Sequence, residues 1–203
     1  MGLSGMSANM EFGKAFTTRP TGLHGYYKYT PAVINKVDRT PAGVTIVQGE
    51  TMDQCAIFIA LAKKTFTFNN KNEDQYIQYA TDPNIIAYGE LPSGAATEGD
   101  GYVEFNIPLK YKNLTDQPTH IIVVCSSSKY GDYMTGGVGS TLYVDDLSLI
   151  YDGRLLSGNN SLYSRNPFRP LEIHFLRPVN AFRGLEMLSR DKKIHFEVSR
   201  STS

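Results

Sequence analysis

The chain has 203 residues, of which 41% are hydrophobic and 11% aromatic, and its formal net charge at pH 7 is zero. A chain of this length can bury one sizeable core, and its overall charge gives no reason to expect a nucleic-acid partner or an anionic membrane. The longest apolar run, residues 55–62, is too short to be a transmembrane segment, and no signal peptide is visible.

Five segments have the apolar or alternating pattern of β-strands: 25–30, 54–63, 101–111, 119–128 and 140–151. Residues 54–63 are continuously apolar, as in a strand that is covered on both faces. Pro108 cannot donate to a neighbouring strand, which predicts an edge position or a bulge there. Polar loops separate these segments, and a short helix is expected only near 73–80 or 184–192. The pattern predicts an all-β protein with an antiparallel jelly-roll or β-sandwich fold.

The sign of the charge changes along the chain. Residues 1–151 carry eleven basic and fifteen acidic residues, whereas residues 152–203 carry nine basic and five acidic ones. This reversal divides the chain into a domain, 1–151, and a basic C-terminal extension, 152–203. Within the extension, residues 171–176 and 192–199 have strand-like patterns. An anionic partner is one explanation of the extension, and a poorly ordered appendage is the favoured one.

Few residues suggest catalysis or a transition-metal site. Cys55 and Cys125 lie in apolar strand-like runs and are expected to be buried thiols, with a disulfide between facing strands as the alternative. The four histidines have no metal-ligand spacing. A strand rather than a helix follows the glycine-rich residues 136–139, so a tight turn is expected there and not a phosphate loop. No catalytic residue is assigned, since the carboxylates of 98–104 equally fit a solvated hairpin.

Two adjacent aspartates, Asp145 and Asp146, interrupt the last predicted strand. Adjacent strand residues point to opposite faces, and the inward apolar phase switches at this pair, which predicts a bulge or a strand covered on both sides. One aspartate is then poorly solvated and needs a partner. A structural calcium ion is one possible partner, and a hydrogen bond to a neighbouring loop is the other.

A tyrosine-rich loop is the best candidate for a ligand site. Residues 69–79, "NNKNEDQYIQY", combine amide side chains with two tyrosines. A tyrosine ring can stack on the apolar face of a sugar while amides bind its hydroxyls. The sequence therefore predicts glycan binding by Asn72, Tyr76, Gln78 and Tyr79. Packing of both rings into the core is the competing interpretation.

Two blocks, "RPTGLHGYYKYTP" (19–31) and "SSSKYGDYMTGGVGSTLYVDDLSLIY" (126–151), resemble the putative carbohydrate metabolism domain found in surface lipoproteins of Bacteroides and relatives. The resemblance covers residues 10–151. It implies a fold similar to jelly-roll carbohydrate-binding modules. In that wider group a carboxylate of the last strand often holds calcium, which implies a structural calcium ion at Asp145 or Asp146.

The resemblance also implies a function. It predicts a non-catalytic carbohydrate-binding or carbohydrate-metabolism module of a bacterial cell-surface protein, with a glycan as partner. A glycoside hydrolase-like enzyme and a structural or adhesive surface domain are the alternatives. Family members carry further sequence before the first block and end near the last strand. By comparison, this chain is expected to lack the opening strands of the jelly roll.

Overall fold

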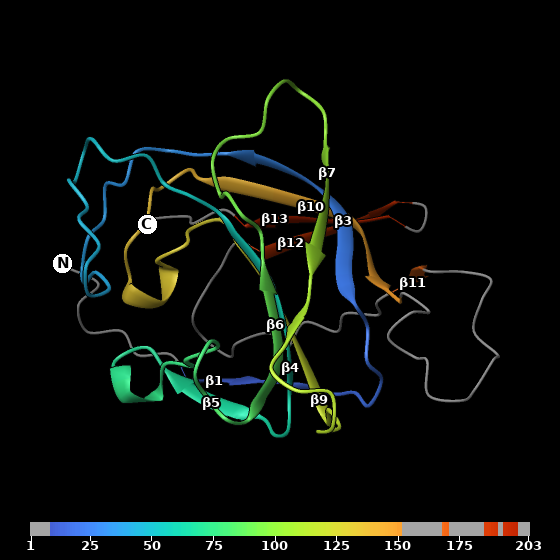
Figure 1. Ribbon diagram of the computed structural model, residues 1–203. Helices are drawn as coiled ribbons and strands as arrows, with labels where there is room; N and C mark the ends of the chain where they lie inside the picture. The colour runs from blue at the N-terminus through green and yellow to red at the C-terminus, as the bar shows by residue number, and fades with distance from the viewer. Residues whose placement is uncertain (1–8, 152–167, 171–184, 191–192, 199–203) are drawn as a thin grey trace.

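The computed structural model describes residues 9–151, 168–170, 185–190 and 193–198. Two antiparallel sheets form the body of the protein (Figure 1). The first has the order β11-β10-β3-β7 and contains β3 (Gly22–Thr30), β7 (Val103–Pro108), β10 (Thr141–Ile150) and β11 (Phe168–Pro170). The second has the order β2-β9-β4-β6-β8 and contains β2 (Lys14–Ala15), β4 (Ala56–Ala62), β6 (Ile85–Glu90), β8 (Lys110–Tyr111) and β9 (His120–Ser126).

Two strand pairs complete the described elements: β1 (Asn9–Phe12) with β5 (Phe66–Asn69), and β12 (Leu185–Arg190) with β13 (Lys193–Val198). Every strand pairing among the described residues is antiparallel. The predicted all-β antiparallel sandwich is therefore confirmed. None of the helices in the described residues is long and apolar enough to cross a membrane.

The sandwich core consists of the inward-facing side chains of both sheets. Its most deeply buried members come from β3, β4, β7 and β10: Leu23, Tyr29, Ile57, Ile59, Leu61, Ile107, Leu142 and Val144. A second apolar cluster lies on the opposite face of β4 and includes Ala60, Ala62, Phe66, Ile85 and Ile122. The strand β4 is thus covered on both faces, as its continuous apolar sequence predicts.

The sequence predicts the edge position of β7 correctly and one of the helices incorrectly. β7 is an edge strand and ends at Pro108, as predicted. The helices in the described residues are single 3-10 turns, η2 (Glu73–Gln75) and η3 (Gly131–Tyr133). The helix predicted near 184–192 is wrong, because residues 185–190 pair with β13 as strand β12. The strand-like segment 171–176 lies outside the described residues.

Part of the C-terminal extension joins the sandwich. β11 pairs with the end of β10, with Ile150 opposite Phe168. The division at residues 151 and 152 stays a prediction. In the body of the sandwich, Cys55 and Cys125 are free thiols, and burial raises the pKa of each to about 12. The prediction of free thiols is confirmed, with Cys55 buried and Cys125 half-buried.

A buried carboxylate joins three loops at one end of the sandwich. Asp53 is 2% exposed, and its Oδ2 atom accepts hydrogen bonds from the hydroxyls of Ser128 and Ser140, at 2.6 and 2.9 Å. The same oxygen accepts a hydrogen bond from the backbone N–H of Gly137 at 2.7 Å. The glycine-rich residues 136–139 therefore form a tight turn over a carboxylate that the chain itself supplies.

Candidate functional site

Three aromatic side chains lie together on the outer face of the five-stranded sheet. Phe58 is on β4 and Tyr88 on β6, and Tyr79 reaches them from the loop before β6. The Tyr79 and Tyr88 rings stack, with centroids 5.1 Å apart and planes 17° apart. The Phe58 centroid is 4.9 Å from that of Tyr79. All three side chains are half-buried, and we call them the aromatic platform.

Strand register and one small residue explain why the platform side chains lie together. Phe58 pairs with Glu90 and Ala60 pairs with Tyr88, so these four side chains share one face of the sheet. Ala60 lacks bulk, which leaves space on the sheet beside Tyr88. A turn in which the backbone N–H groups of Thr81 and Asp82 donate to the Gln78 carbonyl fixes the loop that carries the third ring.

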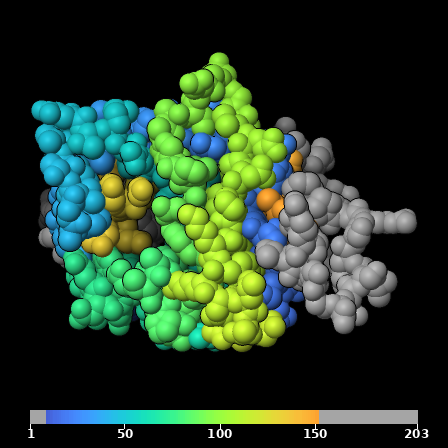
Figure 2. Space-filling view, in the orientation of Figure 1, coloured from blue at the N-terminus to red at the C-terminus, as the bar shows by residue number. Residues whose placement is uncertain are grey.

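Charged groups border the platform. The Tyr88 hydroxyl donates a hydrogen bond to the Glu90 carboxylate. Lys110, on β8, pairs directly with Tyr88 and therefore belongs to the same face of the sheet. Burial, and then the nearby Glu90 carboxylate, raise the pKa of the Tyr88 phenol. The site thus offers flat apolar rings beside hydrogen-bonding groups of both charges. Figure 2 shows the green surface of the chain from β6 to β8 across the middle of the visible face.

Asp132, in the turn η3, lies close to the tyrosines of this region. Its charge acts on the phenols of Tyr76, Tyr79 and Tyr133. Asp132 is an exposed residue, yet the surrounding protein buries much of its carboxyl group and raises the pKa of that group. An acid with a raised pKa can hold a proton at a higher pH than an ordinary aspartate.

The four predicted glycan ligands do not form one cluster. Tyr79 belongs to the aromatic platform, whereas the Tyr76 ring lies 4.9 Å from Phe68 on one side and 4.9 Å from Tyr133 on the other. Asn72 is exposed and accepts a hydrogen bond from the Asp74 N–H, which caps η2. Gln78 is exposed next to the platform. Glycan binding by these four residues stays a prediction.

Tyr76 has a structural role. Its hydroxyl can donate to the backbone carbonyls of Asn70, at 2.9 Å, and Asp132, at 2.8 Å. These two carbonyls belong to different loops, so Tyr76 links the β5–η2 segment to η3. The short spacing between Tyr76 and Tyr79 therefore does not bring their two rings into one site.

Sequence reasoning missed the partners of Tyr79. Tyr88 and Glu90 share one face of β6 because they are two residues apart, and this alternation in "IIAYGE" is a usable signal. Their proximity to Phe58 depends on the β4–β6 pairing, which the local sequence does not specify. Asp132 carries no sequence signal, because its environment is made by residues from a distant loop.

The predicted bulge at the paired aspartates is confirmed. The register between β3 and β10 shifts between Asp145 and Ser148, and Asp146 has φ = 49°, in the left-handed region. Asp145 is 8% exposed, whereas Asp146 is exposed. The Asp145 carboxylate accepts a hydrogen bond from the Asp146 N–H at 2.9 Å. One aspartate is therefore poorly solvated, as expected.

The predicted calcium ion would need six to eight oxygen ligands. In the part of the chain that the structure describes, no group of three or more His, Cys, Asp or Glu side chains is placed to hold a metal ion. The bulge brings only Asp145 into the interior, so the described side chains supply one buried carboxylate and do not by themselves make a calcium site. Calcium binding there stays a prediction.

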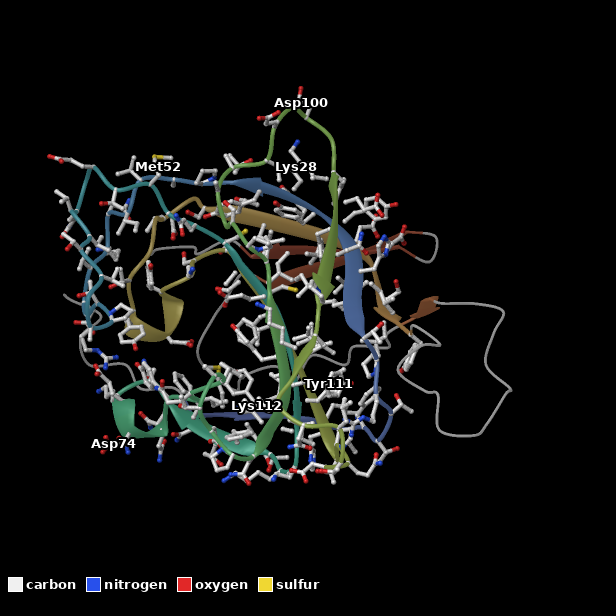
Figure 3. All side chains as sticks on the ribbon, in the orientation of Figure 1. Lys28, Met52, Asp74, Asp100, Tyr111 and Lys112 are labelled. Atoms are coloured by element: carbon white, nitrogen blue, oxygen red, sulfur yellow. The ribbon has the colours of Figure 1, made fainter. Side chains whose placement is uncertain are left out.

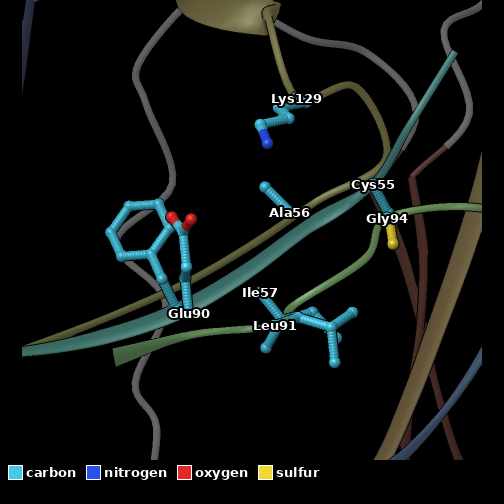
Figure 4. Close-up of a pocket in the computed structure, with 8 residues that line it drawn as sticks. Cys55, Ala56, Ile57, Glu90, Leu91, Gly94 and Lys129 are labelled. Carbon is cyan, nitrogen blue, oxygen red and sulfur yellow. The ribbon is translucent and has the colours of Figure 1, made fainter. Parts of the chain in front are cut away.

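A small pocket lies beside the platform, between β4, β6 and the start of the 129–137 loop (Figure 4). Glu90, Lys129 and Cys55 are among the residues that line it. Its volume of about 20 Å³ is enough for about one water molecule. This pocket is too small for a sugar ring, so a sugar at the platform would lie on the surface of the sheet.

Several solved structures resemble the chain, among them two from Bacteroides species. A putative glycoside hydrolase from Bacteroides thetaiotaomicron VPI-5482 is 28% identical, with a TM-score of 0.52, and the match covers 70% of this chain and 41% of that one. A putative glycoside hydrolase from Bacteroides vulgatus ATCC 8482 is 23% identical, with a TM-score of 0.47, and the match covers 68% and 54%. The chain therefore matches only about half of either protein. Curated proteins gave no match.

A family model matches most of the chain. The model of the putative carbohydrate metabolism domain matches residues 2–150, which include both sheets of the sandwich except β11. The match contains the platform and both aspartates of the β10 bulge. A carbohydrate-related function is consistent with this family and with the description of the 28% identical structure. This chain belongs to the putative carbohydrate metabolism domain family.

Proposed function

We propose that the chain is a non-catalytic glycan-binding module and that the aromatic platform is its binding surface. The stacked, half-buried Tyr79 and Tyr88 rings carry the proposal. Stacking covers one face of each ring, so a sugar would place its C–H face against the other face, with the tyrosine hydroxyls as polar contacts at the edge. Glu90 and Gln78, both exposed, are placed to bind sugar hydroxyls.

The arrangement favours binding over hydrolysis. Glycoside hydrolysis needs two carboxyl groups on either side of the scissile bond. At the platform, the Glu90 carboxylate already accepts a hydrogen bond from Tyr88, and the pocket beside it holds no more than about one water molecule. Catalysis would also require a sugar to be enclosed more deeply than on an open sheet face.

A glycoside hydrolase is the second candidate, and Asp132 is the observation in its favour. The raised pKa of its carboxyl group is what a general acid needs. Glu90 would then be the second carboxylate, and the 28% identical structure is described as a putative glycoside hydrolase. Release of reducing sugar from a glycan that binds, and its loss in both Asp132→Asn and Glu90→Gln, would favour this candidate over the first.

A glycan panel with matched variants tests the proposal. Tyr88→Ala should weaken binding several-fold, corresponding to about 1 kcal/mol for a lost aromatic contact, while Tyr88→Phe should keep most of the affinity. Tyr143→Ala, on the other sheet, is the control. Melting temperatures of all three variants separate lost contacts from lost folding. Unchanged affinity in Tyr88→Ala would exclude the platform, and a parent protein that binds no glycan would favour the structural or adhesive role.

The proposed location is a bacterial cell surface, which rests on the likeness to surface lipoproteins. Labelling of intact cells that express the full-length protein tests this. Protection of the domain from an added protease until the cells are lysed would contradict it.

A further inference from the structure

Basic side chains gather at one end of the five-stranded sheet. Four segments meet there: 11–19, 62–66, 82–86 and 110–120. Strand pairing joins them, since Ala62 lies between His120 and Ile85 and the Lys112 N–H donates to the Ile86 carbonyl. Figure 3 shows Lys112 and Tyr111 at this end and Asp100 at the opposite end. We call these segments the basic end.

The charge of the basic end is opposite to that of the domain. Its segments contain six cations, namely Lys14, Arg19, Lys63, Lys64, Lys110 and Lys112, and three carboxylates, namely Glu11, Asp82 and Asp116. Residues 1–151 as a whole have an excess of acidic residues. The lysines are therefore concentrated in one place rather than spread among the acids, which creates a positive potential at this end.

Much of this charge is not neutralised within the protein. Lys63 forms an ion pair with Asp116 at 2.8 Å, and Lys112 donates to a backbone carbonyl. Among the described residues, no carboxylate lies within ion-pair distance of Lys14, Lys64 or Lys110. All three are exposed. An exposed cluster of cations without internal partners can attract an anionic ligand.

The basic end is continuous with the aromatic platform. Lys110 pairs directly with Tyr88 across β6 and β8, so the platform and the first lysine share one face of the sheet. The Lys64 ammonium lies 5.2 Å from the centre of the Phe66 ring, which belongs to the same outer apolar cluster as Tyr88. The segment with Lys14 lies close by, since a Cβ atom on Gly13 would be 3.3 Å from the Cα atom of Thr65. Lys14 itself pairs with Ile121, a member of the inner core, so its side chain belongs to the face opposite the platform.

From this continuity we infer that the glycan is an acidic polysaccharide, whose chain rests on the aromatic platform and whose carboxylates or sulfates contact the basic end. The inference depends on the proposed glycan-binding function and adds the class of ligand. An anionic membrane fits less well, because membrane-docking surfaces present a broad apolar face. In the described part of the basic end, Leu114 is the exposed large apolar side chain.

Polygalacturonate and its fully methyl-esterified form test the inference, because they share a backbone and differ in charge. The parent protein should bind the acidic form about tenfold more tightly at low salt, and this preference should shrink as salt rises. The double variant Lys64→Glu/Lys110→Glu, which reverses the charge of the two lysines next to the platform, should lose the preference. Lys28→Glu/Lys36→Glu, with the same change of charge outside the basic end, should keep it.

The outcomes separate this inference from the proposed function. Equal binding of both forms by the parent, or a preference that survives in Lys64→Glu/Lys110→Glu, overturns the acidic ligand while glycan binding stands. Binding to vesicles of anionic phospholipid without binding to polygalacturonate overturns it in favour of a lipid surface. A several-fold loss of glycan affinity in Tyr88→Ala, with the melting temperature unchanged, supports the platform in either case.

Discussion

The carboxylate of Asp53 accepts a hydrogen bond from the backbone N–H of Gly137, although 84 residues separate the two in the chain. The Ser140 hydroxyl donates to the same carboxylate and accepts a hydrogen bond from the Ala32 N–H at 3.0 Å. Asp53 in turn donates its own N–H to the Ala32 carbonyl at 2.9 Å. This network fixes the loop that carries Asp132 relative to the strands.

Asp53→Asn should therefore destabilise the protein strongly. An asparagine directs an N–H₂ group or a neutral oxygen at donors that need a carboxylate, and we expect a loss of about 3 kcal/mol in the free energy of unfolding. Chemical denaturation measures it. Asp100→Asn, in the exposed loop between β6 and β7, is the matched control and should change stability little. Equal midpoints for the two variants would show that the network contributes little.

Gly137→Ala should also destabilise the fold, for a steric reason. A Cβ atom there would lie 2.8 Å from the Ala32 carbonyl oxygen and 2.9 Å from that of Val33. Backbone atoms cannot move aside as a flexible side chain can, so a cost of about 1–3 kcal/mol is expected. Gly101→Ala is the control, because nothing lies within 4 Å of its added Cβ. A melting temperature for Gly137→Ala equal to that of the control would contradict the packing described.

The bulge in β10 makes Asp146 sensitive to the shape of its side chain. Its φ of 49° is tolerated by aspartate, asparagine and glycine but costs a β-branched residue about 1–2 kcal/mol. Asp146→Val should lower the melting temperature, whereas Asp146→Gly should preserve it. If both variants melted together below the parent, the carboxylate rather than the backbone conformation would be the important feature.

Calcium binding at the bulge gives a separate prediction. If Asp145 contributes a ligand, calcium should raise the melting temperature of the parent and have no effect on Asp145→Asn. Magnesium at the same concentration controls for ionic strength, and Asp100→Asn controls for the loss of one exposed charge. A parent whose melting temperature does not respond to calcium would leave the hydrogen bond from the Asp146 N–H as the role of this carboxylate.

Asp132 should make stability depend on pH. Burial raises the pKa of its carboxyl group above the usual 3.8, so the folded protein binds a proton that the unfolded chain has released. Stability contributed by this proton is complete below pH 3.8 and is lost as the pH rises through the folded pKa. Asp132→Asn should lack this loss, so its stability relative to the parent should increase over the same pH range. Asp74→Asn, on exposed η2, is the control, and parallel profiles for both variants would contradict the burial of Asp132.

The strands could be predicted because their signal is local. The continuous apolar run in β4 and the proline that ends β7 each reflect what immediate neighbours allow. The change of phase at Asp145 and Asp146 predicted the bulge for the same reason, since the period of two fails at the point where the backbone inserts extra residues.

The candidate site could be predicted only in part. Tyr79 was recognised as a ligand candidate, but the contact of its ring with Phe58 is set by the pairing of β4 with β6. Nothing in the local sequence indicates that Asp53 is a buried carboxylate, because its hydrogen-bond donors lie 75 to 87 residues further along the chain. Residue type and spacing show what chemistry is available, whereas strand pairing decides which of these groups meet.

The two free cysteines, one buried and one half-buried, allow the opening of the sandwich to be followed chemically. A thiol with a pKa of about 12 is almost entirely protonated at neutral pH, and the protonated form reacts slowly with alkylating reagents. Cys55 lies just before β4 and Cys125 is in β9, in the central pair of the five-stranded sheet. The rate at which these sulfurs are modified therefore measures how fast the two strands separate at the centre of the molecule, and no label has to be introduced.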